Sequence, residues 1–132
     1  MVFKMAREKK GFTLIELIAV VIVVAILAGL SLGKYEKATE RTMDEEAKAA
    51  LILIQAAQNI YRQKNDVYYE SDNEADINAN LSLNLILGNW DYKTRTALPY
   101  IGIAERQSTT RSRIFSIGPT GEPICTSGAC DY

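Results

Sequence analysis

The sequence predicts an α+β protein in which one long N-terminal helix spans a membrane with its first half. A small antiparallel sheet of about three strands packs on the second half of that helix. Residues 12–32 form an apolar run with a single charge, Glu16. Apolar side chains then recur at helical spacing through Tyr61, and from Trp90 onward the period changes to two. At 132 residues, the chain has room for one modest core beside the apolar run.

The apolar run is long enough to cross a bilayer as a helix. A run of this length covers about 30 Å at the helical rise, which matches the hydrocarbon thickness. A secretory signal peptide is the alternative, because "AILAGLSLG" supplies the small residues found at cleavage sites. Four basic residues precede the run: Lys4, Arg7, Lys9 and Lys10. By the positive-inside rule, the N-terminus stays in the cytoplasm and the remainder is exported.

Glu16 is the residue of the run that needs an explanation. A carboxylate on an isolated membrane helix costs roughly 2.5 to 3.5 kcal/mol at the bilayer centre, so a functional partner is expected. The plainer interpretation is that Glu16 reaches the cytoplasmic surface from the first turn of the helix.

The stretch "KKGFTLIEL" at residues 9–17 resembles the prepilin signal of type IV pilins and type II secretion pseudopilins. The resemblance implies that a membrane prepilin peptidase cleaves between Gly11 and Phe12 and then methylates the new amino group of Phe12. It also implies three segments. These are a cytoplasmic leader, a transmembrane and filament-core helix, and an exported pilin-like head, at residues 1–11, 12–33 and 34–132.

Cleavage would give Glu16 its partner. In a filament of staggered helices, Glu16 of one subunit can approach the Phe12 amine of the next, and the pairing offsets the desolvation of both groups. Helix packing has a second signal, because Ala25, Gly29 and Gly33 recur at a spacing of four and "GLSLG" is a G-x-x-x-G motif. Glycines are common in membrane helices, so chance is the alternative. Many family members carry proline where this chain has Gly33, so the resemblance leaves open whether the helix unwinds locally here in a filament.

The helical pattern continues past the apolar run. Its apolar stripe is expected to be core packing with no cofactor, and its small alanines let a sheet lie close. We expect one helix to about Lys64, with "ND" at residues 65 and 66 as its stop signal. The stripe comprises Met43, Ala47, Ala50, Leu51, Ile54, Ala57 and Tyr61.

The following segment is polar and acidic to residue 80 and apolar over residues 81–87. We expect a loop with room for one short helix, followed by a buried segment. Ile77 and Leu83 stand where an EF-hand requires glycine and glutamate, so a solvated acidic loop is favoured over a calcium site. The alternating residues that raise the question of calcium are Asp72, Glu74, Asp76 and Asn78.

Three antiparallel strands are expected within residues 89–97, 99–108 and 112–123, each of which mixes aromatic or β-branched residues with polar ones. Arg106, Arg111 and Arg113 flank the second turn and form a weak basic patch. Such a patch could meet a phosphate backbone, but the chain has a net charge of −1. A solvated turn is therefore favoured over nucleic-acid binding.

Cys125 and Cys130 bracket "TSGA" near the C-terminus. A pair in an exported domain predicts a disulfide, because a zinc site needs further ligands and the chain has neither histidine nor a third cysteine. The bridge resembles the C-terminal disulfide loop of type IV pilins, which many major pseudopilins lack.

Taken with the resemblance, these features predict a structural subunit of a type IV pilus-like filament. Its expected partners are further copies of the chain, the prepilin peptidase, the inner-membrane assembly machinery and, before assembly, membrane lipid. The subunit would be a single-pass inner-membrane protein that ends in a filament at the cell surface or in the periplasm. A type II secretion pseudopilin or a competence pilin is the nearest alternative, and a secreted binding module is a remote one. No enzymatic activity, metal or cofactor is expected, since the sequence holds no histidine, G-x-S-x-G motif or phosphate loop.

Overall fold

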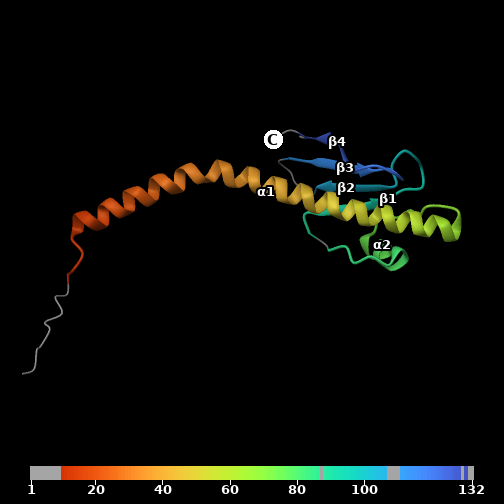
Figure 1. The fold of residues 1–132 in the computed structure, drawn as a ribbon, viewed down its shortest axis with the longest axis horizontal. Coiled ribbons are helices and arrows are strands. Elements are labelled where there is room, and N and C mark those ends of the chain that lie inside the picture. The colour runs from red at the N-terminus through yellow and green to blue at the C-terminus, as the bar shows by residue number, and fades with distance from the viewer. Residues whose placement is uncertain (1–9, 87, 107–110, 129, 131–132) are drawn as a thin grey trace, which may run out of the picture. The chain divides into compact units, whose positions relative to one another are not determined.

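The computed structural model describes residues 10–86, 88–106, 111–128 and 130. Most of the leader, at residues 1–9, and the turn at residues 107–110 lie outside the described residues. The chain divides into two compact units, Met1–Ala38 and Thr39–Tyr132. The elements, labelled in Figure 1, are α1 (Leu14–Asn65), α2 (Glu74–Leu81), β1 (Trp90–Thr94), β2 (Gly102–Arg106), β3 (Arg113–Ile117) and β4 (Ile124–Gly128).

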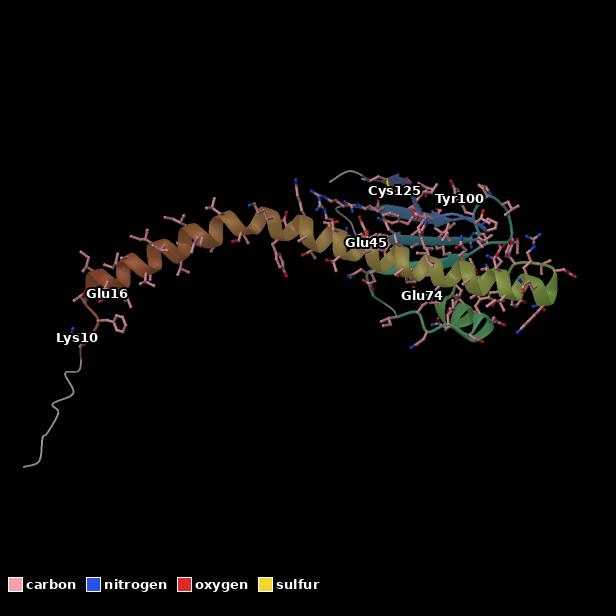
Figure 2. The ribbon with its side chains drawn as sticks, viewed as in Figure 1. Lys10, Glu16, Glu45, Glu74, Tyr100 and Cys125 are labelled. Carbon is pink, nitrogen blue, oxygen red and sulfur yellow. A yellow bond between two sulfur atoms is a disulfide. The ribbon has the colours of Figure 1, made fainter. Side chains whose placement is uncertain are left out.

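Helix α1 confirms the long helix that the two consecutive apolar patterns predict. It includes a window long and apolar enough to cross a membrane, and none of that window is buried within the chain. Figure 2 shows the side chains of its first half projecting on all sides. The helix ends at Asn65, and Asp66 takes the left-handed conformation with φ of 62°. The stop signal was therefore placed correctly, although the aspartate rather than the asparagine adopts the left-handed backbone.

The strands form one antiparallel sheet in the order β1-β2-β3-β4, so the α+β fold class is confirmed. The expectation of about three strands was one short, because Ile124–Gly128 pairs with β3 as a fourth strand. This strand lies at the sheet edge and is mostly exposed. An exposed edge strand need not alternate between apolar and polar residues, which removes the signal on which the other three were recognised.

The core of the second unit lies between α1 and the sheet (Figure 1). The predicted stripe faces the sheet, with Ala47, Leu51 and Ile54 fully buried. The rings of Trp90 and Phe115 meet edge to face at 5.6 Å between centroids. The sheet approaches α1 most closely at Gly102, where a Cβ would lie 3.0 Å from Ile54 Cγ2.

The acidic segment contains the short helix for which the sequence left room, because its last part forms α2. The side chain of Asn73 caps this helix by accepting a hydrogen bond from the Ala75 amide at 2.9 Å. Ile77 and Leu81 bury one side of α2 against the core. Of the apolar segment at residues 81–87, Leu81 and Leu85 are buried, Ile86 is exposed and Leu87 lies outside the described residues.

Candidate processing and assembly site

The Gly11–Phe12 junction lies immediately before the first turn of α1. Helix α1 begins at Leu14, and the Phe12 side chain is 84% exposed. Thr13 caps the helix, since its carbonyl and its hydroxyl both accept from the Glu16 amide, at 3.1 and 3.3 Å. The predicted cleavage position is therefore accessible and outside the helix.

Glu16 lies in the first turn of α1, where an acid is favoured by the positive end of the helix dipole. Its side chain is exposed. Together with Lys10, Gly11 and Phe12, it lines a shallow surface hollow. The structure thus places Glu16 beside the predicted cleavage position within one chain.

The predicted packing residues lie on the uncovered part of α1. Ala25, Gly29 and Gly33 are exposed, and their four-residue spacing places them along one face of the helix. A Cβ added at Gly29 or Gly33 would contact nothing within 4 Å. Ser31 bonds back to the Leu27 carbonyl at 2.9 Å, so its hydroxyl is satisfied within the helix. Among the described residues, no contact requires glycine at either position.

The predicted basic patch is wrong for two of its three arginines. The Arg113 side chain is fully buried and bonds Asp44 of α1 at 2.5 Å. Arg106 is paired with Glu40 through both carboxylate oxygens, and only about a tenth of its side chain is exposed. Both arginines come from strands β2 and β3, whose inner sides face α1, so they are internal partners instead of a solvated surface. Arg111 is exposed.

The ion pairs alter the titration of the groups that form them. Hydrogen bonding from Arg106 lowers the pKa of Glu40, and Glu40 in turn raises the pKa of Arg106. Elsewhere in the head, burial raises the pKa of the Tyr92 hydroxyl to about 12, with Glu46 and Glu74 adding to the effect.

Cys125 and Cys130 form the predicted disulfide. Cys125 lies on β4 and packs against the core from the sheet edge. The bridge therefore ties the segment after β4 back to that strand.

Asp72 and Asp76 are exposed, as a solvated segment requires, but the segment is not a loop throughout, because Glu74 and Asp76 form the first turn of α2. Glu74 is largely buried, and its Oε1 accepts a hydrogen bond from the Tyr92 amide at 3.1 Å. Among the described residues there is no cluster of three or more side chains suited to hold a metal ion.

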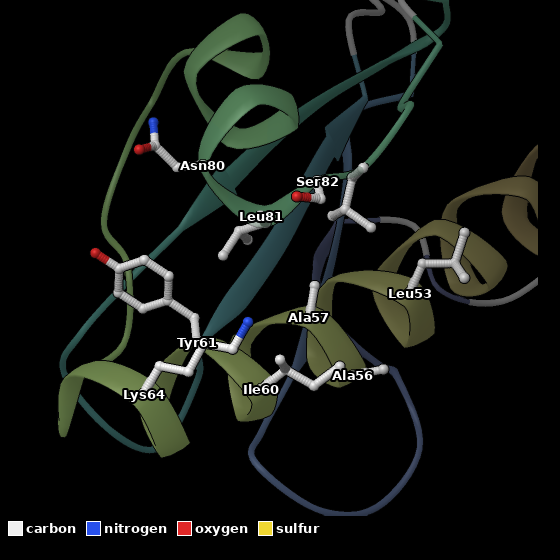
Figure 3. Close-up of a pocket in the computed structure, with 10 residues that line it drawn as sticks. Leu53, Ala56, Ala57, Ile60, Tyr61, Lys64, Asn80, Leu81 and Ser82 are labelled. Atoms are coloured by element: carbon white, nitrogen blue, oxygen red, sulfur yellow. The ribbon is translucent and has the colours of Figure 1, made fainter.

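The head also has an apolar groove of about 410 Å³ between α1 and the segment around the end of α2 (Figure 3). Leu53 and Ile60 form its α1 side and are each more than half exposed. Lys64 is the only charged residue among those that line it, so the groove offers surface for packing and no acid–base pair.

Sequence reasoning missed two residues that shape these sites. Thr13 was not singled out, although "TLIE" fits the capping-box pattern in which Thr precedes Glu by three residues. Asp44 was also missed, although it lies three residues before Ala47 on the apolar stripe. A polar residue on such a stripe is a signal for a buried partner.

Comparisons with known proteins match part of the chain. Residues 6–32 match the family described as the prokaryotic N-terminal methylation motif. The type IV major pilin protein PilA of Myxococcus xanthus (strain DK1622) is 37% identical over 67 residues, which cover 51% of this chain and 30% of that relative. No solved structure matches the chain. The chain therefore carries the prepilin methylation motif, and the resemblance to the type IV pilin family that its sequence predicts is confirmed.

Proposed function

We propose that this chain is the structural subunit of a type IV pilus-like filament, assembled from the inner membrane after a prepilin peptidase cleaves it. The observation that carries the proposal is the arrangement at the start of α1. There, an exposed Gly11–Phe12 junction outside the helix precedes an uncovered apolar helix with one acid, Glu16.

Cleavage between Gly11 and Phe12, followed by methylation, creates an amine at the cytoplasmic edge of the helix. Once subunits leave the bilayer, the apolar helix needs a new cover, and copies of the same helix supply one. Within that bundle, Glu16 pairs with the Phe12 amine of a neighbouring subunit. Each charge then has a partner in an environment where an unpaired charge costs several kcal/mol.

Ala25, Gly29 and Gly33 let the helices of such a bundle approach closely. The support is that Gly29 and Gly33 have open space where a Cβ would be, so no contact with the described part of the chain accounts for them. Small residues at a four-residue spacing are typical of close helix contacts in membranes.

A pilus is favoured over a secretion pseudopilus by two observations. The Cys125–Cys130 disulfide has the position of a pilin C-terminal bridge, and the relative from Myxococcus xanthus is a type IV major pilin. The subunit then passes from a single-pass inner-membrane protein, with a cytoplasmic N-terminus and exported head, to a surface filament. That the chain has no enzymatic activity stays a prediction.

Intact mass of the membrane-extracted protein tests processing. We expect a chain that starts at Phe12 and carries one additional methyl group. Gly11→Leu should keep residues 1–11 attached, whereas the control Gly33→Leu, away from the junction, should be cleaved normally. Retention of the leader in assembled wild-type material, or an N-terminus beyond Leu30, would contradict the proposal.

A strain with this gene as its only pilin gene distinguishes a pilus subunit from a secretion pseudopilin. Immunogold labelling with antibody to the head should decorate surface filaments, and deletion should remove them while protein secretion continues. Loss of secretion without any loss of surface filaments would identify a secretion pseudopilin instead.

A further inference from the structure

Two lysines stand together where the apolar run of α1 ends. Lys34 and Lys37 are exposed and lie on α1 just beyond Leu32. Residues three apart on a helix are surface neighbours, about 5 to 6 Å between Cβ atoms, so the two ammonium groups can reach one ligand. Glu36 does not oppose Lys34, because two residues turn a helix by about 200°.

The acids nearest to this pair do not neutralise it. In the part of the chain that the structure describes, neither Lys34 nor Lys37 forms a salt bridge. Glu40 follows Lys37 at a favourable spacing, but both of its carboxylate oxygens bond Arg106. The pair therefore keeps its positive charge available for a group outside the chain.

The position of the pair selects the kind of partner. The apolar run matches the hydrocarbon thickness, so the residues directly after Leu32 reach the level of the lipid headgroups. Lysines at this depth extend their alkyl stems along the apolar region and place their ammonium groups among phosphates. Tyr35, 73% exposed on the same turn, is typical of membrane–water interfaces.

We propose that Lys34 and Lys37 bind the headgroup phosphate of an anionic phospholipid in the exported leaflet while the subunit waits in the membrane. The proposal rests on the membrane-embedded precursor of the proposed function. The charge complementarity is direct, since the pair is cationic and the ligand is anionic. Such a contact holds the helix at a fixed depth until assembly.

The test uses the full chain reconstituted in phosphatidylcholine bilayers that contain a small fraction of spin-labelled lipid. Electron spin resonance then measures how strongly the chain prefers phosphatidylglycerol over phosphatidylcholine. We expect Lys34→Gln/Lys37→Gln to lower this preference severalfold, at most about fivefold for each lysine removed. The preference should also weaken as sodium chloride is added.

Two control variants isolate the exported pair. Glu36→Gln changes an acid on the same turn and should not lower the preference. Lys9→Gln/Lys10→Gln removes leader charges on the other side of the apolar run. The two sites should act independently, so in the combined variant the fold-change in lipid preference should be the product of the two separate fold-changes. Inorganic phosphate added at constant ionic strength should change nothing, and competition by phosphate would assign the pair to free phosphate instead of lipid.

Equal lipid preference in the wild type and in Lys34→Gln/Lys37→Gln would overturn the proposal. If the chain does not enter the bilayer at all, both this proposal and the membrane stage of the proposed function are wrong. If the lipid preference is as expected but no filament forms in cells, only the filament proposal is wrong.

Discussion

Glu16 and Asp44 are carboxylates on the same helix, but they differ in burial and in pairing. Asp44 is 2% exposed and is bonded to Arg113, which lies on β3. Glu16 is exposed, on a stretch that none of the described residues covers. The head thus supplies a partner for this buried charge, whereas Glu16 is exposed and accessible to a partner on another molecule.

Two glycines show the same contrast in packing. A Cβ at Gly102 would lie 3.0 Å from Ile54 Cγ2 and 3.1 Å from Ile117 Cγ2, so the head uses the missing side chain to bring its sheet onto α1. At Gly29 the same space is empty. A small residue in the head serves an internal contact, and a small residue in the apolar run is available for an external one.

Replacing Glu16 tests the contrast with the largest expected effect. Glu16→Leu removes the costly group from the membrane segment, so insertion and cleavage should proceed as before. The Phe12 amine of a neighbour would then enter the bundle without a counter-charge, at a cost on the order of 3 to 5 kcal/mol if fully buried. Electron microscopy of a strain with this variant as its sole copy should show no filaments, while processed subunit accumulates in the membrane. Filaments of normal number and length would show that the salt-bridge account is wrong and that Glu16 is only an exposed surface charge.

Breaking the internal pair should destabilise the head itself. Arg113→Met leaves Asp44 charged and buried, which costs about 3 to 5 kcal/mol in free energy of unfolding. Urea unfolding of the detergent-solubilised chain, followed by Trp90 fluorescence, measures this loss because Trp90 is 1% exposed in the core.

The matched double variant Asp44→Leu/Arg113→Met removes both charges and should recover most of the lost stability. Glu16→Leu should leave the same transition unchanged. If Glu16→Leu lost as much head stability as Arg113→Met, Glu16 would also contribute to the fold of the head, and the contrast with Asp44 would be wrong.

Alanine at the two glycines sharpens the comparison of packing. Gly102→Ala should lower the free energy of unfolding by about 1 to 3 kcal/mol, since the new methyl group must displace Ile54 or Ile117. Gly29→Ala should not lower it, because its methyl group meets only open space. A destabilised head in Gly29→Ala would place an unrecognised internal contact on the apolar run.

The smallest expected effect is a pH dependence of the head. The pKa of Glu40 is lowered by the hydrogen bond from Arg106, so the pair stabilises the fold fully above the unfolded-state pKa of about 4.5. This contribution is lost as the pH falls through the lower folded-state pKa. In Arg106→Gln the loss of stability on acidification should be smaller than in wild type. Urea unfolding at a series of pH values measures this change in the free energy of unfolding. Lys93→Gln, which removes the partner of Glu105 on the sheet, is the control and should lose as much stability on acidification as the wild type.

Much of the fold could be predicted because its signals are local. The three-and-four spacing of residues 43–61 predicts the buried side of α1, and the period of two predicts β1, β2 and β3. Strand β4 was not predicted, because "ICTSG" is an exposed edge strand in which apolar and polar residues do not alternate. The short helix α2 was expected but its bounds were not, because it has only two buried apolar residues, Ile77 and Leu81, which is too few to show a period.

The arginines show what local patterns do not contain. "RQSTTRSR" is polar throughout, and nothing near it in sequence reveals that Arg106 and Arg113 meet acids more than 60 residues earlier. The available clue was alternation, because Arg113 shares a strand face with Phe115 and Ile117. The junction, Glu16 and the small-residue spacing could be identified from the sequence, but the contacts proposed for them are between molecules and do not appear in the fold of one chain.

The long separation between Asp44 and Arg113 also bears on biogenesis. Synthesis proceeds from the N-terminus, so α1 is complete while β3 is still to be made. Until the strands arrive, the apolar stripe at Leu51 and Ile54 lacks its cover and Asp44 lacks its base. A translation product that stops before Arg113 leaves Asp44 without that partner and the apolar stripe without the part of its cover that β3 supplies, so it would be more open to proteases. Chains that lack the last strands should therefore be degraded faster than the full-length chain.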